Sequence, residues 1–281
     1  VRNGEDSYCL VSAGAWTEYD ADFLRKAAED KMPELGYIEI QDVTTQWGVF
    51  AIAGPKSRDV LKAVINDADP DTALSNKRFP WLSARQIELG MCPVNAIRVA
   101  YTGELGWELH HPMEMQNYLF DLLEKAGEPH GMKLVGARAQ NWLRQEKSYR
   151  AFGNELGRDA TPAEADLPRF IDLSKDFHGK DAMVATGVRS KCITVLIDGP
   201  ADADPWGREA LYDMDGNRIG RLTSGGYSVA FEKSIGMGYV KPDLAVVGAN
   251  VQVKIQDKLW PAQIVEDSPY DPKNATIRVD G

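Results

Sequence analysis

The first third of the chain combines two hydrophobic periods. Apolar residues at helical spacing, among them Phe23, Leu24 and Ala27, predict an amphipathic helix, whereas the alternation in YIEIQDV predicts a half-buried strand. The predicted elements, in chain order, are a strand over 8–11, a helix over 21–30, strands over 37–43 and 47–53, and a helix over 56–65. With antiparallel pairing of its strands, this order is typical of a ferredoxin-like α+β unit.

A second set of elements comes after the polar segment 67–77. The predicted elements are strands over 94–99 and 107–110, helices over 113–126 and 137–148, and a short closing helix over 180–186. Between the last two helices, Thr161-Pro162 with Glu164 three residues after the threonine has the pattern of a capping box, which predicts the start of a helix.

The pattern changes after Lys191 to short strands separated by turn residues. The strand-like segments are CITVLI, EALYDM, RIGRLTS, IGMGYV, VQVKI and PAQIV, and Gly225-Gly226 are counted among the turns between them. The segment 213–217 between two of these strands predicts a hairpin. We therefore expect an α+β chain with a first ferredoxin-like unit over 1–77, a second unit over 78–190, and an all-β barrel over 191–281.

Composition and charge narrow the choice of partners. The 281 residues carry a net charge of −10, which gives no basic footprint for nucleic acid. No apolar run is long enough to cross a membrane. The three cysteines are widely spaced and predict reduced thiols in a cytosolic compartment or a mitochondrial matrix. The pair His110-His111 lacks other ligands at metal-site spacing, so no metal is expected.

The segment YTGELGWEL at 101–109 carries the most specific pattern. Gly103 and Gly106 imply a tight turn between two strands, which Tyr101 enters and Glu108 leaves. A tyrosine and a glutamate around a hairpin are by themselves most often structural. Glu104 is expected to be a carboxylate of the turn or of the surface.

A second pattern, ARAQNWLRQEKSYRAFG, covers 137–153. Helical spacing brings Trp142, Leu143 and Glu146 near one face of a helix. Arg144 and Glu146 are candidates either for a structural ion pair or for ligand contacts, and the residues alone leave both open.

Taken together, four segments resemble the folate-binding family of aminomethyltransferases, which includes the glycine-cleavage T-protein and the C-terminal folate module of dimethylglycine and sarcosine dehydrogenases. The first two segments are similar to the family patterns YTGExGxE and RALxSLRLEKGYRAWG. The third family-like segment combines TPAEADL with KDFHGKDAM, and the fourth is GRLTSGGYSVAFEKSIGMGYV. The terminal YDP segment resembles the dehydrogenase branch in particular. The resemblance implies a cloverleaf of the three units around a cleft that binds tetrahydrofolate.

The resemblance also implies roles for individual side chains. Glu108 would accept both N–H donors of the pterin edge in a bidentate, charge-assisted pair, and Tyr101 would line the site near the reactive nitrogen as a candidate catalytic residue. Tyr149 and Tyr227 would line the ligand, and Arg144 is a further candidate ligand contact.

The glutamate tail of folate requires a cation. The T-protein pattern has an arginine four residues before the arginine of its RLE, where this chain has Gln140. Arg138 is the nearest substitute and is therefore the candidate for the tail. In the family, an aspartate near the folate nitrogens precedes the strand that matches 1–11. It is expected upstream of Val1, together with about fifty further residues of the first unit.

The predicted activity is transfer of a one-carbon unit from a small methylamine-type donor to tetrahydrofolate. The chain has no GxGxxG fingerprint, so no FAD site is expected within it, and a flavin domain or an N-terminal segment is an expected partner. Two alternatives stay open. One is a folate-binding or regulatory module without chemistry of its own, and the other is a direct folate-dependent demethylase of a sulfonium or an aryl methyl ether.

Overall fold

The computed structural model describes residues 1–199, 202 and 204–280, which form two compact units. Unit 1 contains Val1–Val99, Gly106–Met132 and Asp280, and unit 2 contains Ala100–Leu105 and Lys133–Val279. None of the helices formed by the described residues has the length and apolar character needed to cross a membrane.

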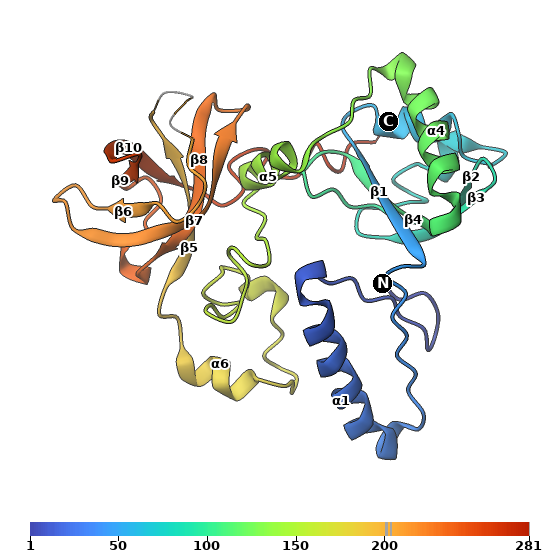
Figure 1. Cartoon of the computed structure of the whole chain (residues 1–281), viewed down its shortest axis with the longest axis horizontal. Helices are drawn as coiled ribbons and strands as arrows, with labels where there is room; N and C mark the ends of the chain where they lie inside the picture. Colours follow the sequence, from blue (N-terminus) through green and yellow to red (C-terminus); the bar gives the residue numbers. More distant parts are fainter. Residues whose placement is uncertain (200–201, 203, 281) are drawn as a thin grey trace. The chain divides into compact units, whose positions relative to one another are not determined.

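Unit 1 is built around an antiparallel sheet in the order β1-β4-β3-β2 (Figure 1). Its elements are η1 (Gly14–Trp16), α1 (Thr17–Leu35), β1 (Trp47–Ala53), α2 (Ser57–Lys62), α3 (Pro70–Ala73), β2 (Ala84–Leu89), β3 (Cys92–Ile97), β4 (Gly106–Pro112), η2 (Met113–Met115), α4 (Gln116–Gly127) and η3 (Glu128–His130). The predicted strand over 47–53 is confirmed, as are helices within 21–30, 56–65 and 113–126.

The two faces of this sheet differ because side chains alternate along each strand. Trp107 and Leu109 of β4 are fully buried on the face against which α4 packs, where Phe50 also contacts Phe120 with ring centroids 6.0 Å apart. Glu108 points to the opposite face. The core of unit 1 therefore lies between the sheet and the helices α2 and α4.

Two strands predicted in the N-terminal region are wrong. Residues 8–11 and 37–43 lie outside regular strands, and Tyr8 takes part only in an isolated bridge with Arg2. Tyr37 is 84% exposed, so its alternating segment has no sheet to cover. Alternation allows a strand, but a strand forms only where a neighbour satisfies its backbone groups.

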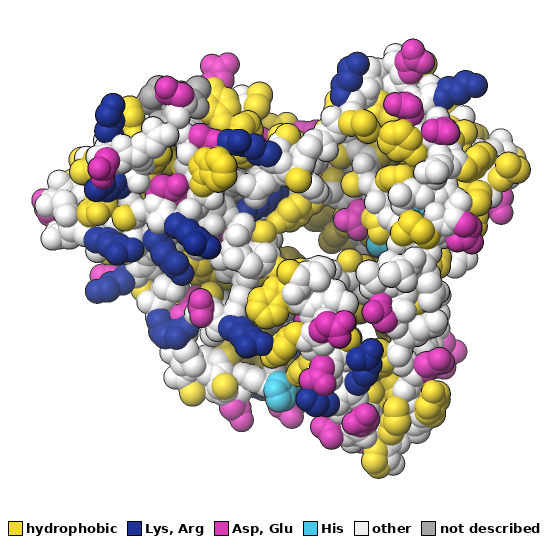
Figure 2. Space-filling model, in the orientation of Figure 1, with side chains coloured by type: hydrophobic (Ala, Val, Ile, Leu, Met, Phe, Trp, Pro, Cys, Tyr) yellow, Lys and Arg dark blue, Asp and Glu magenta, His cyan; other side chains and the backbone are white. Residues whose placement is uncertain are grey.

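The helix α1 exposes much of its apolar surface. Tyr19 and Phe23 are about half exposed, at 54% and 48%, and Ala28 is its buried residue. Apolar and charged side chains mix over this helix in Figure 2. Lys26 and Asp22 form an ion pair on it. The periodicity that predicted this helix therefore describes its conformation rather than its burial.

The boundary predicted between residues 77 and 78 runs through the sheet of unit 1. The strand β1 lies before this boundary and pairs along its whole length with β4, from Trp47 opposite Pro112 to Ala53 opposite Gly106. Strands of both predicted α+β units thus belong to one sheet, which also contains β2, a strand that the sequence pattern missed. The α+β class with a C-terminal barrel is confirmed.

Unit 2 contains a closed barrel in the strand order β10-β5-β8-β7-β6-β9 (Figure 1). Its elements are α5 (Ala137–Glu146), η4 (Pro168–Phe170), α6 (Lys180–Thr186), β5 (Lys191–Ile197), β6 (Ala210–Tyr212), β7 (Arg218–Ser228), β8 (Lys233–Val240), η5 (Pro242–Leu244), β9 (Asn250–Ile255) and β10 (Lys258–Val265). Closure pairs every strand on both sides and so removes exposed edges. The six predicted strand segments are confirmed.

The interior of the barrel is filled by aliphatic side chains from its alternating strands. Its fully buried members include Val195, Ile197, Leu211, Leu222 and Val253. The predicted hairpin is also confirmed, because the Asp213 N–H donates to the Asn217 carbonyl over 2.9 Å and the Asn217 N–H donates to Asp213 Oδ1 over 2.8 Å.

Gly225 and Gly226 do not form the predicted turn. They lie inside β7, which continues from Arg218 to Ser228. A Cβ atom at Gly225 would lie 2.5 Å from the Pro205 carbonyl oxygen, and one at Gly226 would overlap the Trp142 ring of α5. These glycines therefore allow close approach of other chain segments to a continuous strand.

Candidate functional site

The segment 101–105, which we call the Tyr101 turn, brings two predicted site residues together in unit 2. The rings of Tyr101 and Tyr149 are stacked, with centroids 6.1 Å apart and an angle of 17° between their planes. The Tyr101 hydroxyl donates to the Arg150 carbonyl over 3.1 Å. The C-terminal end of α5 and the residues after it thus hold one side of the turn.

Both phenols stay protonated at neutral pH. Burial raises the pKa of the Tyr101 hydroxyl, and the nearby Arg144 charge only partly opposes this effect. Burial likewise raises the pKa of the Tyr149 hydroxyl. At neutral pH both rings therefore present a neutral phenol to any ligand beside them.

Glu108 lies on β4 of unit 1, on the sheet face opposite α4. Its side chain is 34% exposed, and its Oε2 atom lies 3.3 Å from Nε2 of the buried His110, two residues further along the strand. The next residue, His111, is fully buried on the other face, where its Nδ1 atom lies 2.9 Å from the Leu109 carbonyl oxygen. Glu108 is thus a partly exposed carboxylate, and His110 is its one side-chain hydrogen-bond partner among the described residues.

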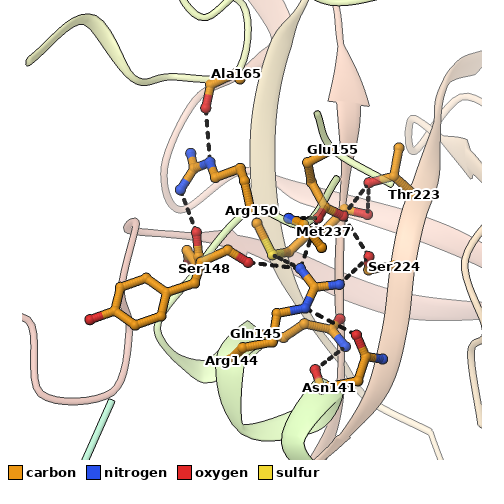
Figure 3. A network of polar contacts seen from close by, with 12 residues as sticks. Asn141, Arg144, Gln145, Ser148, Arg150, Glu155, Ala165, Thr223, Ser224 and Met237 are labelled. Carbon is orange, nitrogen blue, oxygen red and sulfur yellow. Dashed lines mark hydrogen bonds and ion pairs between the residues drawn. The ribbon is translucent and has the colours of Figure 1, made fainter. Parts of the chain in front are cut away.

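Arg144 lies at the centre of a buried polar network (Figure 3). Its Nη1 atom donates to Glu155 Oε2 and to the Tyr149 carbonyl, both over 2.8 Å. Its Nη2 atom donates to Ser224 Oγ over 2.5 Å, and its Nε atom donates to Asn141 Oδ1 over 3.0 Å. Each guanidinium nitrogen therefore has a partner within the protein, which favours the structural alternative for Arg144.

The partner of Arg144 is Glu155, so the alternative of an ion pair between Arg144 and Glu146 is wrong. Both Arg144 and Glu155 have side chains that are 0% exposed. Glu146 instead accepts hydrogen bonds from Ser228 Oγ over 2.5 Å and from the Ala230 N–H over 3.1 Å. Sequence reasoning missed Glu155 because it lies in an irregular segment, where spacing does not indicate which side chains meet.

Arg138 is engaged with side chains of unit 2. Its guanidinium forms an ion pair with Asp204 and lies over the rings of Trp142 and Trp206, 5.2 Å from each centroid. These residues line a small cavity of about 130 Å³. A carboxylate of the folate tail would have to share Arg138 with Asp204, so the tail contact stays a prediction.

Tyr227 lies on β7 and is half-buried against α5. Its ring contacts Trp142 with centroids 6.4 Å apart, and Trp142 in turn rests on the backbone at Gly226. The structure therefore brings Tyr227 to the junction between the helix and the barrel, together with Trp142 and Arg138.

Lys147, Tyr270 and Asp271, which the sequence did not single out as site residues, surround the Tyr101 turn. The Lys147 ammonium donates to the carbonyls of Tyr270 over 3.0 Å and of Asp271 over 2.6 Å, and Lys147 is only 1% exposed. The Tyr270 hydroxyl donates to Glu104 Oε1 over 3.3 Å. Glu104 is therefore half-buried in a polar cluster. The resemblance had indicated the segments that hold Lys147 and Tyr270, but not that they meet.

The cysteines of the described residues are all free. Cys92 and Cys192 are buried, and Cys9 is partly exposed. Burial raises the pKa of the Cys192 thiol to about 12, so this sulfur stays protonated and unreactive at neutral pH.

Comparison with known families matches almost the whole chain. Residues 1–175 match the model of the GCVT N-terminal domain, and residues 191–271 match that of the glycine cleavage T-protein C-terminal barrel domain. The fold is similar to that of the crystal structure of the glycine cleavage system aminomethyltransferase T from Bartonella henselae, with a TM-score of 0.72 at 22% identity over 92% of this chain and 67% of that one. The fold is therefore that of an aminomethyltransferase.

Curated relatives include dehydrogenases and aminomethyltransferases. Dimethylglycine dehydrogenase from Homo sapiens is 38% identical over 85% of this chain, which spans only 28% of the length of that relative. An aminomethyltransferase from Natranaerobius thermophilus is 30% identical over 95% of this chain and 70% of its own length. The chain belongs to the glycine cleavage T-protein family, and thus to a family of one-carbon transferases.

Proposed function

We propose that this chain binds tetrahydrofolate and transfers to it a one-carbon unit from an N-methyl amine of the dimethylglycine, sarcosine or aminomethyl type. The product would be 5,10-methylenetetrahydrofolate or a methyltetrahydrofolate. The greater identity to dimethylglycine dehydrogenase than to the aminomethyltransferase supports a methylamine donor. Because the chain spans 28% of that dehydrogenase, oxidation of the donor is proposed for a flavin-containing partner or domain rather than for this segment.

The observation that carries this proposal is the environment of Glu108. The carboxylate is partly exposed and has one side-chain hydrogen-bond partner among the described residues, His110 at 3.3 Å. It therefore keeps acceptor positions for a ligand with two parallel N–H donors, as on the edge of a pterin. These free acceptor positions are what the proposed contact requires.

The chemistry asks little of the protein beyond binding and proton management. Tetrahydrofolate supplies the nitrogen nucleophile that accepts the one-carbon unit. Glu108 would orient the pterin through its donor edge. Within unit 2, the stacked rings of Tyr101 and Tyr149 form a flat apolar surface, and the neutral Tyr149 phenol carries a donor at its rim. Such positioning is a large part of the rate gain available to a bimolecular transfer.

Substitution of Glu108 tests the proposal. We expect Glu108→Gln to weaken tetrahydrofolate binding by roughly tenfold or more, because the neutral amide loses the charge assistance and offers one acceptor oxygen instead of two. Binding is measured by calorimetry and by the shift of the thermal transition with ligand. Glu124→Gln, on the exposed side of α4, is the matched control and should bind as the wild type does.

Two results would contradict the proposal. One is absence of any tetrahydrofolate effect on the wild-type chain, and the other is equal affinity of the wild type and Glu108→Gln. An assay for methylenetetrahydrofolate, with a methylamine donor and the oxidising partner supplied, then separates a transferase from a module that only binds folate.

A further inference from the structure

The Tyr101 turn rests directly on the side chain of Lys147. Gly103 has φ +78° and is buried, and a Cβ atom at this position would overlap the Lys147 methylene stem. The absence of a side chain at Gly103 therefore allows the stem to pass beneath the turn. Lys147 is consequently an internal support of the turn rather than a surface lysine.

The head group of Lys147 joins this turn to the terminal YDP segment. Its ammonium donates to the Tyr270 and Asp271 carbonyls, while the Tyr270 N–H donates to the Glu146 carbonyl over 3.0 Å. The Tyr270 hydroxyl closes the ring of contacts by donating to Glu104 inside the turn. The segments 101–105, 146–147 and 270–271, which are distant in sequence, thus meet at the Lys147 side chain.

The pKa shifts of Lys147 and Glu104 agree with their burial in one fixed polar cluster. Burial lowers the pKa of the Lys147 ammonium, and the carboxylates of Asp271 and Glu104 oppose that effect. Burial raises the pKa of the Glu104 carboxyl, which the hydrogen bond from Tyr270 opposes. A buried cation with two carbonyl acceptors costs much free energy to release, so the cluster resists local opening.

We propose that Lys147 is a positioning residue, which holds the Tyr101 turn against the 270–271 segment and so orients Tyr101 for the pterin. The part that concerns the pterin rests on the proposed function. The part that concerns the turn does not, because it depends on contacts within unit 2 alone. Lys147 itself needs no contact with substrate in this role.

Hydrogen exchange tests the structural part without any ligand. Lys147→Met keeps an unbranched stem beneath Gly103 but removes the ammonium, so the amides of 102–105 should exchange roughly tenfold or more faster than in the wild type. Lys233→Met, which removes a surface ion pair with Asp198, is the matched control and should leave the turn protected. Unchanged exchange in Lys147→Met would overturn the inference.

A double-mutant cycle tests the link to Tyr101. Lys147→Met should raise the Kd for tetrahydrofolate roughly tenfold in the wild-type background and by less than about twofold in the Tyr101→Ala background. Additive effects would mean that Lys147 does not act through Tyr101 and would overturn the positioning role. If the wild type binds no tetrahydrofolate, the proposed function fails with the pterin part of this inference, while the exchange data still decide the role in the turn.

A milder variant covers the case in which Lys147→Met does not fold. Tyr270→Phe removes only the hydroxyl donated to Glu104, on the opposite side of the same ring of contacts. It should speed exchange of the same amides by a smaller factor, and exchange equal to that of the wild type would count against the cluster as the support of the turn.

Discussion

Single residues of this chain show how burial selects between two chemically reasonable roles. Arg144 and Glu146 are both plausible ligand contacts by sequence, yet the fold buries Arg144 completely and pairs it with Glu155 at 2.8 Å. Glu108, by contrast, stays partly exposed. A charge that is fully enclosed has to be matched inside the protein, whereas a partly exposed one remains available to a ligand.

The enclosed pair leads to a prediction about stability. Glu155→Gln would leave the Arg144 guanidinium buried without its counter-charge, and we expect the free energy of unfolding of unit 2 to fall by about 3–5 kcal/mol. Denaturant unfolding, followed by a probe in the barrel, measures this loss in the free energy of unfolding. Asp198→Asn, which breaks the exposed pair with Lys233, should change it by less than about 1 kcal/mol. Equal effects of the two substitutions would disprove the network as the main support.

At the scale of elements, the capping box shows that a local signal can predict hydrogen bonds without predicting a helix. The Thr161 N–H donates to Glu164 Oε2 over 2.8 Å, and the Glu164 N–H donates to Thr161 Oγ1 over 3.2 Å, so the reciprocal contacts of the capping box form. The helix expected after them does not, because the chain continues as a turn. Arg189 donates to the same carboxylate, which ties it to a tertiary partner instead.

The Glu164 carboxylate should make the free energy of unfolding depend on pH. The hydrogen bonds from Arg189 are the main cause that lowers the pKa of Glu164 from its ordinary 4.5 to about 2. Because the folded-state pKa is the lower one, the ionised group stabilises the fold above about pH 4.5, and that contribution is lost as the pH falls toward 2.

Comparison with Glu164→Gln isolates the contribution of this group. The stability difference between wild type and Glu164→Gln, measured by denaturant midpoints, should be largest near pH 6 and should shrink steadily toward pH 2. A difference that stays constant over this range would show that Glu164 acts through packing rather than through its charge.

Contact between α5 and β7 leads to a second prediction at this scale. Gly226→Ala would place a methyl group against the Trp142 ring, so we expect a loss of roughly 1–3 kcal/mol in the free energy of unfolding. Gly136→Ala, at the start of α5 with no atom within 4 Å of the added Cβ, should stay within about 0.5 kcal/mol of the wild type. Thermal unfolding of both variants measures the difference, and similar losses would contradict the close approach.

The whole molecule is best understood through its two compact units. Unit 2 unites the barrel with α5 and with the Tyr101 turn, although this turn lies within the stretch of chain that otherwise forms unit 1. Unit 1 carries Glu108 on its sheet. The family match over residues 1–175 and 191–271 covers both units.

The sequence by itself was sufficient to predict the family, the C-terminal barrel and most of the helices. Strands of the barrel are short, evenly spaced and bounded by turn residues, so each is recognisable locally. The hairpin at 213–217 is likewise a local structure with its own hydrogen bonds. Local periodicity also placed α4 and α5 on the chain, because a helix satisfies its backbone groups within itself.

Only the tertiary structure decided which distant residues meet. It joined β1 to β4 across a predicted boundary, left 37–43 without a strand, and chose Glu155 rather than Glu146 as the partner of Arg144. It also brought Lys147 to the 270–271 carbonyls. Strand pairing and buried ion pairs depend on long-range neighbours, and no spacing within one segment encodes which neighbour the folded chain will supply.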